Sequence, residues 1–264
     1  MQKNGLFALA FHSLIVLFVL APLIVVCLVA FTPQNTLSLP WDGVSLRWFS
    51  AVFHHPDFVA SFWNSARLAL FSATISTTLA VPSALAITRY SFRGRDALNA
   101  LFLSPLIIPH LVIGVAFLRL FSFIGATGSF GWLVAAHVMV IMPYALRLIL
   151  AALNGMDLSA EMAARTLGAG EWIVFRRITF PMLLPGISGG WLLAFINSFD
   201  ELTMSIFVTA PSTITLPVRM YMYASESIDP MMAAVSTLMI ALTGITMIIL
   251  DRLFGLDQLL VGKG

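Results

Sequence analysis

Charged residues are scarce in this chain. Lys, Arg, Asp and Glu together make up 10% of the 264 residues, whereas 59% are hydrophobic, and the mean hydropathy is +0.96. A soluble domain of this length cannot bury so much apolar surface, so lipid is predicted to be the solvent around most of the chain. The formal net charge of +2 is too small to indicate nucleic-acid binding.

Several chemical signatures are also missing. The single cysteine, Cys27, stands in an apolar stretch and cannot form an internal disulfide. No phosphate-binding loop of the form G-x-x-x-x-G-K-[S/T] occurs, so the chain cannot power transport by itself. His12, His110 and His137 lack metal-ligand spacing, which favours helix packing over metal binding. Neither catalysis nor a metal site is therefore predicted.

Six apolar stretches are long enough to cross a bilayer. They are predicted at residues 12–31, 62–88, 97–121, 132–150, 182–209 and 233–250. The first continues into Thr32-Pro33 without a cleavage site, which indicates a retained helix rather than a signal peptide. No repeat or soluble domain interrupts the pattern. The sequence predicts an all-α membrane protein with six transmembrane helices, a single domain over residues 1–264.

The basic residues predict the orientation of these spans. With the N-terminus in the cytoplasm, ten of the fourteen basic residues fall on the cytoplasmic side: Lys3, Arg89, Arg93, Arg95, Arg147, Arg165, Arg176, Arg177, Arg252 and Lys263. Arg47 and Arg219 fall outside, and Arg67 and Arg119 lie within spans near their outer ends. This distribution follows the positive-inside rule, so both termini are predicted to be cytoplasmic.

Residues 157–185 form the one long polar insertion between apolar segments. Asp157 is expected to cap a short helix, and Gly168 is expected to end that helix in a left-handed conformation. A second short helix is predicted at Glu171–Arg177. Two short helices joined by a glycine elbow, with a mixed apolar and basic surface, indicate a docking element on the cytoplasmic side.

The spacing A-A-x-x-x-G, followed by I-x-x-P, is carried by Ala163, Ala164, Gly168, Ile178 and Pro181. It resembles the signature loop of inner-membrane permeases of binding-protein-dependent ABC importers. The resemblance implies the type I importer permease fold, with a coupling loop over about residues 157–181 that seats on a cytoplasmic ATPase. The coupling residues it implies are Leu158, Glu161, Met162, Ala163, Ala164, Arg165 and Gly168. That family usually has Glu six residues before the glycine; here Met162 stands there and Glu161 is displaced by one.

Two adjacent acids stand in the apolar segment LLAFINSFDELTMSIFV. A carboxylate at membrane depth costs several kcal/mol unless it faces protein or water, so Asp200 and Glu201 are candidates for a substrate path, together with Asn197 and Phe199. Because successive helical residues point about 100° apart, the two acids are not expected to face one cavity. The alternative is a structural ion pair with Arg119 or Arg67.

The segments RYSFRGR (residues 89–95) and SFDELTMSIFV (residues 198–208) resemble the second permease of spermidine/putrescine importers. This resemblance implies an inner-membrane permease that works with a second permease, two ATPase subunits that bind ATP and magnesium, and a periplasmic binding protein. It implies no cofactor in the chain itself. Opines, aminophosphonates and inorganic anions remain alternative solutes, since related permeases carry them.

Two other classes of protein remain as alternatives to the importer. A secondary transporter or channel predicts inverted repeats or rings of charge, and the sequence shows neither. A purely structural membrane scaffold leaves Asp200 and Glu201 unexplained.

Overall fold

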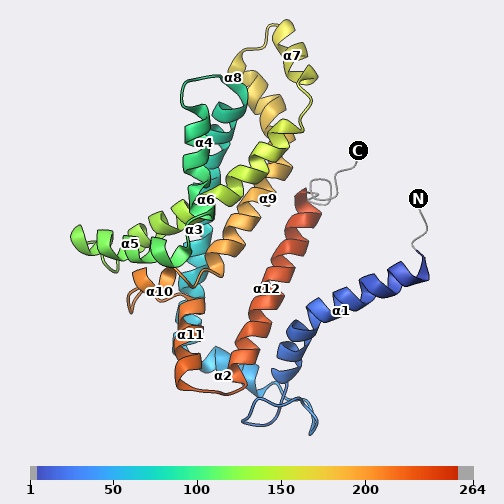
Figure 1. The fold of residues 1–264 in the computed structure, drawn as a ribbon, viewed down its shortest axis with the longest axis vertical. Helices are drawn as coiled ribbons and strands as arrows, with labels where there is room; N and C mark the ends of the chain where they lie inside the picture. Colours follow the sequence, from blue (N-terminus) through green and yellow to red (C-terminus); the bar gives the residue numbers. More distant parts are fainter. Residues whose placement is uncertain (1–4, 255–264) are drawn as a thin grey trace. The chain divides into compact units, whose positions relative to one another are not determined.

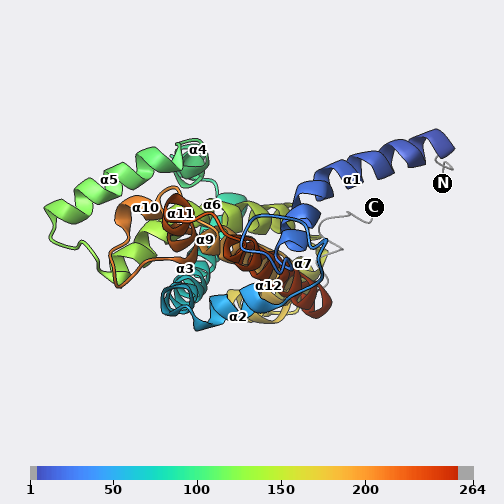
Figure 2. The same cartoon turned by 90° about the horizontal axis from the view of Figure 1, so that it is seen from below.

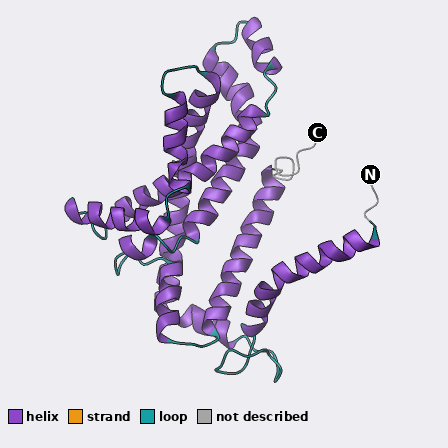
Figure 3. Cartoon of the chain, viewed as in Figure 1, coloured by secondary structure: helices purple, strands orange, loops and turns teal. Residues whose placement is uncertain are grey.

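The computed structural model describes residues 5–254, and within them it consists of helices joined by turns and loops without a β-strand (Figures 1 and 3). Contacts between residues divide the chain into two compact units. One comprises Met1–Ala60 and Arg219–Gly244, and the other Ser61–Val218 and Ile245–Gly264. Lys3 and Lys263, which were predicted to be cytoplasmic, lie outside the described residues.

The smaller unit contains α1 (Leu6–Val29) and α2 (Arg47–His54), with parts of α3 (Pro56–Arg89), α11 (Leu216–Glu226) and α12 (Met231–Phe254). The apolar stretch of α1 is unburied within the chain, as expected for a helix that lipid or another subunit covers. Polar contacts order the connections: Arg219 pairs with Asp57 at 3.2 Å, and Tyr223 donates to Asp229 at 2.5 Å. The helix α1 begins at Leu6, six residues before the predicted start.

The larger unit contains most of α3 and a series of helices that carry the candidate site. In chain order these are α4 (Arg95–Leu103), the 3-10 turn η1 (Ser104–Leu106), α5 (His110–Phe123), α6 (Phe130–Asn154), α7 (Ser159–Thr166), α8 (Glu171–Val174), the π-helical turn η2 (Phe175–Thr179), α9 (Phe180–Phe199) and α10 (Ser205–Val208).

Small residues allow α6 and α9 to pack closely along the larger unit (Figure 1). A Cβ added to Gly186 would lie 2.5 Å from the Cβ of Ala152, and one added to Gly190 would lie 3.1 Å from the Cα of Ala145. The four-residue spacing of these glycines predicts such an approach, and the structure confirms it. Leu146 and Leu183 are fully buried in the core that this packing creates.

Within residues 5–254, five helices are long and apolar enough to span a membrane, and α4 with η1 would make a sixth span if it is joined to α5. The sequence predicts a third span over 97–121 whose regularity Pro105 and Pro109 break, and the structure bends the chain there by 98° between α4 with η1 and α5. Pro109 stands at the break with an extended ψ of 130°. Proline lacks the N–H of a helical hydrogen bond and disfavours helix in the preceding residue, so the chain turns there.

The predicted fifth span over 182–209 is wrong at its end. The helix α9 stops at Phe199, and Asp200 and Glu201 lie in the break before the short helix α10. In Figures 1 and 2, α10 lies beside α5. A Cβ on Gly114 of α5 would meet the Phe207 side chain at 2.8 Å, so the contact requires glycine. The two broken spans of the larger unit therefore pack against each other.

Candidate coupling surface and path residues

The predicted docking stretch folds as two short helices, α7 and α8, joined through Gly168. The carboxylate of Asp157 accepts the backbone N–H of Ser159 at 2.9 Å and its hydroxyl at 2.7 Å, and these bonds hold the pKa of Asp157 below its usual range. Gly168 has a φ of +84°, which confirms the predicted left-handed position at the end of α7.

The second docking helix differs from its predicted range of 171–177. The α-helix α8 ends at Val174, and the chain continues through the π-helical turn η2 directly into α9. A π-helical turn contains an extra residue relative to an α-helical turn, and such turns are frequent at functional sites. The docking stretch is therefore continuous with a membrane helix at one end.

Most of the predicted coupling residues face outward. Leu158, Met162, Ala163, Arg165 and Gly168 are exposed, Ala164 is half-buried and Glu161 is buried. Met162 is 58% exposed, and Leu167 and Trp172 in the same loop are 89% and 69% exposed. Apolar side chains that are this open on a charged loop indicate a surface that another protein covers.

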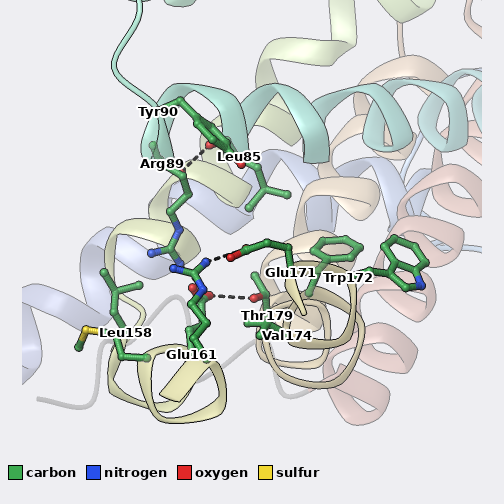
Figure 4. Close-up of a pocket in the computed structure, with 13 residues that line it drawn as sticks. Leu85, Arg89, Tyr90, Leu158, Glu161, Glu171, Trp172, Val174 and Thr179 are labelled. Atoms are coloured by element: carbon green, nitrogen blue, oxygen red, sulfur yellow. Dashed lines mark hydrogen bonds and ion pairs between the residues drawn. The ribbon is translucent and has the colours of Figure 1, made fainter. Parts of the chain in front are cut away.

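Glu161 faces the inside of the chain instead. Its Oε1 accepts a hydrogen bond from Arg89 Nη2 at 2.9 Å and another from the Thr179 hydroxyl at 2.8 Å. Figure 4 shows these three side chains converging from α3, α7 and η2. They line a pocket of about 990 Å³ together with aromatic residues that include Tyr90 and Trp172. A second ion pair lies in this pocket, Arg165 Nη2 to Glu171 Oε2 at 2.9 Å, and both of its side chains are exposed.

The four predicted path residues occupy different environments. Asp200 is exposed, whereas Glu201 and Phe199 are buried. The side-chain amide of Asn197 donates to the backbone carbonyl of Leu193 at 2.8 Å, so it is bonded within its own helix. The two adjacent acids therefore lie in different surroundings, one open and one enclosed. In residues 5–254, neither acid forms an ion pair with Arg67 or Arg119.

Glu201 caps the turn that follows it. Its Oε1 accepts the backbone N–H of Met204 and its Oε2 accepts the backbone N–H and the hydroxyl of Ser205, each at 2.8 Å. Nδ1 of His110, the first residue of α5, lies 3.4 Å from the same carboxylate. A buried carboxylate with this many donors satisfies its own hydrogen-bonding needs and those of the helix start.

His137 extends this polar cluster into α6. Its Nδ1 lies 2.9 Å from Ser198 Oγ, and its Nε2 lies 3.1 Å from Ser205 Oγ. Because the Ser205 hydroxyl donates to Glu201, its oxygen is free to accept from His137 Nε2–H. Nδ1 of a neutral imidazole then accepts from Ser198. The sequence predicted that His110 and His137 serve in helix packing. It did not show that His110 contacts Glu201 or that His137 reaches it through Ser205, since Ser198 and Ser205 are 61 and 68 residues from His137.

No group of three metal-ligating side chains occurs within residues 5–254. Apolar spans with an exposed docking loop and a carboxylate at a helix break define the class of the protein: a multi-span membrane subunit that works with partners. Residues 76–255 match the family described as "Binding-protein-dependent transport system inner membrane component". The chain belongs to this family, and it is therefore a transport subunit rather than an enzyme.

Curated relatives match most of the chain. The spermidine/putrescine transport system permease protein PotC of Haemophilus influenzae is 32% identical over 92% of this chain and 94% of its own. PotC of Escherichia coli K12 is 28% identical over 94% and 93%. The putrescine transport system permease protein PotI of the same strain is 30% identical over 86% and 83%.

Solved structures of importers share the fold. A bacterial ABC transporter for the acidic polysaccharide alginate, in complex with a periplasmic protein, contains a chain that matches with a TM-score of 0.72 at 16% identity, covering 94% of this chain and 92% of that one. A chain of the MetNI methionine ABC transporter matches with a TM-score of 0.64 at 18% identity, covering 75% and 94%. The fold is that of ABC importer permeases.

Proposed function

We propose that this chain is one of two permease subunits of an ABC importer that carries a polyamine or a related cationic amine. The observation that carries the proposal is the match to spermidine/putrescine permeases over nearly the whole chain. The exposed carboxylate of Asp200 at the end of α9 supports a cationic solute, because a desolvated ammonium group needs an acceptor. Phe195 and Phe199 stack beside this end of α9, with ring centroids 6.0 Å apart.

The assembly in this proposal contains a second, related permease, two ATPase subunits and a periplasmic binding protein. ATP and magnesium belong to the ATPases, since this chain has no phosphate-binding loop. The exposed apolar face of α7 and α8 is the surface that would seat on an ATPase. Closure of the ATPases moves this surface, and the permease pair switches from inward-open to outward-open.

The orientation of the chain belongs to the same proposal, with the N-terminus in the cytoplasm. The Arg89–Glu161 ion pair supports it, because the basic turn after α3 and the docking loop meet at one end of the larger unit. Both segments are predicted to be cytoplasmic from the distribution of basic residues.

A second solute class has one observation in its favour. The molybdenum transport system permease protein ModB of Escherichia coli K12 is 34% identical, over 60% of this chain and 78% of its own. An exposed carboxylate at Asp200 is unsuited to an anion, since like charges repel at short range.

The test is to purify the transporter with its genomic neighbours and to measure uptake. We expect an ATPase to copurify and radiolabelled spermidine or putrescine to enter proteoliposomes only with ATP and the binding protein. If molybdate is taken up and neither amine is, the solute is an anion and the proposal of a cationic solute is wrong. Uptake without any ATPase would contradict the importer itself.

A further inference from the structure

Glu161 differs from the other predicted coupling residues because its carboxylate joins its own helix to two other elements of the chain. The carboxylate belongs to α7, Arg89 is the last residue of α3, and Thr179 is the last residue of η2. Glu161 is 5% exposed, so water competes little for either hydrogen bond. We call these three residues the Glu161 brace.

The two elements that the brace joins to α7 both lead into the membrane. The helix α3 is a candidate span that ends at Arg89, and η2 leads into the span that contains α9. A buried carboxylate is costly without partners, and here Oε1 of Glu161 accepts both the Arg89 and the Thr179 hydrogen bonds, so a shift of α7 away from them would leave buried charges unpaired. A displacement of α7 therefore moves the ends of α3 and α9 with it.

The second ion pair in the pocket provides the contrast. Arg165 and Glu171 are also 2.9 Å apart, but their side chains are 49% and 76% exposed, compared with 23% and 6% for Arg89 and Glu161. Solvent and salt screen an exposed pair, and such pairs contribute little. This pair also joins only α7 to α8, within the loop, so it makes no connection to α3.

We infer that Glu161 is a positioning residue that transmits movement of the coupling loop to two membrane helices, whereas its neighbour Met162 faces the ATPase. This inference rests on the proposed function, since it requires an ATPase on the outer face of α7. Glu161, which stands one residue before the position of the family's usual Glu, then acts inside the permease rather than at the contact with the ATPase. The Glu161 side chain is buried and the Met162 side chain is exposed. Two adjacent residues of α7 therefore have different roles: Glu161 contacts the membrane helices, and Met162 contacts the ATPase.

The experiment uses the complete transporter in nanodiscs, with Glu161→Gln, Thr179→Val and the charge swap Arg89→Glu/Glu161→Arg. Glu171→Gln in the exposed pair is the matched control. For each variant we would measure how much ATPase copurifies, ATP hydrolysis with and without the binding protein carrying its cellular ligand, and uptake of radiolabelled spermidine per assembled transporter.

We expect Glu161→Gln to retain the ATPase but to lower both the stimulation of hydrolysis and the uptake about fivefold or more, within the range of typical coupling energies. Thr179→Val should lower them less, and the charge swap should recover much of the loss, because it restores an ion pair between α3 and α7. Glu171→Gln should lower the stimulation and the uptake less than Glu161→Gln does, because the exposed pair makes no connection to α3.

Normal stimulation and uptake in Glu161→Gln would overturn the brace while leaving the docking of the ATPase intact. If Glu161→Gln fails to assemble, Thr179→Val is the variant that tests the Glu161 brace. Normal stimulation and uptake in Thr179→Val would then overturn the inferred role of the brace. A wild-type transporter that copurifies no ATPase would instead overturn the proposed function, and the inference with it.

Discussion

Asp200 and Glu201 are adjacent in sequence but lie in opposite environments. Glu201 is 6% exposed and accepts three hydrogen bonds from the turn that begins α10, whereas Asp200 is exposed, and within residues 5–254 its carboxylate accepts no hydrogen bond. Glu201 therefore caps the turn after the helix break, whereas the side chain of Asp200 is left open. We therefore expect a substitution of Glu201 to change stability and a substitution of Asp200 to change uptake.

Glu201→Gln is expected to lower the stability of the folded transporter. The amide has one acceptor oxygen in place of two, and its NH₂ group opposes the N–H of Met204 or Ser205. Leaving a buried donor unsatisfied costs about 1–3 kcal/mol, so the thermal unfolding midpoint in detergent should fall. Asp200→Asn is the control and should leave the midpoint unchanged. An unaltered midpoint for Glu201→Gln would show that the cap is dispensable.

Met162→Arg tests the outer face of the docking loop. The side chain is 58% exposed and apolar, so an arginine should leave the permease folded but place a charge in the contact with the ATPase. We expect less ATPase to copurify and uptake to fall by about fivefold or more, as for a central interface residue that costs more than about 1 kcal/mol. Ser91→Arg, which adds the same charge in the turn after α3, is the matched control. Equal recovery of ATPase in both variants would remove Met162 from the interface.

Part of this site was accessible from the sequence. Scarce charge and apolar length predicted the spans, and the Gly168 elbow and the Gly186/Gly190 spacing were confirmed by the backbone. These features are local, since each depends on a few neighbouring residues. Local signals also indicated that Pro105 and Pro109 would disturb the third span.

The rest depends on contacts between distant segments. Hydropathy continues past Phe199 and could not show that α9 ends there, because the cause is the Glu201 carboxylate capping the next turn. Pro109 marks the position of the bend before α5, but the packing of α5 against α10 at Gly114 and Phe207 joins segments that are far apart in sequence. Likewise, Arg89 and Glu161 are 72 residues apart, and no spacing rule connects them.

The orientation of the chain can be tested at two exposed serines, Ser91 and Ser212. In a Cys27→Ser background, each is replaced in turn by cysteine and treated with a membrane-impermeant maleimide. Because the basic residues favour a cytoplasmic turn after α3, Ser212→Cys should react in intact spheroplasts and Ser91→Cys only after permeabilisation. Labelling of both positions from outside would make the predicted topology wrong.

Asp200→Asn tests the path itself. Asparagine keeps the shape and hydrogen bonding of the side chain but removes its charge, so a cationic solute loses the acceptor that replaces its water. We expect uptake of radiolabelled spermidine, normalised to folded transporter, to fall by about tenfold to 150-fold, as for the loss of a charged hydrogen bond of about 1.5–3 kcal/mol. Protein abundance and the thermal midpoint should stay at wild-type values, because the exposed Asp200 has no ion-pair partner among residues 5–254. Asp200→Glu, which keeps the charge, should retain more uptake than Asp200→Asn. If uptake per folded transporter is unchanged in Asp200→Asn, the solute does not meet this carboxylate; if only abundance falls, the residue stabilises the chain instead.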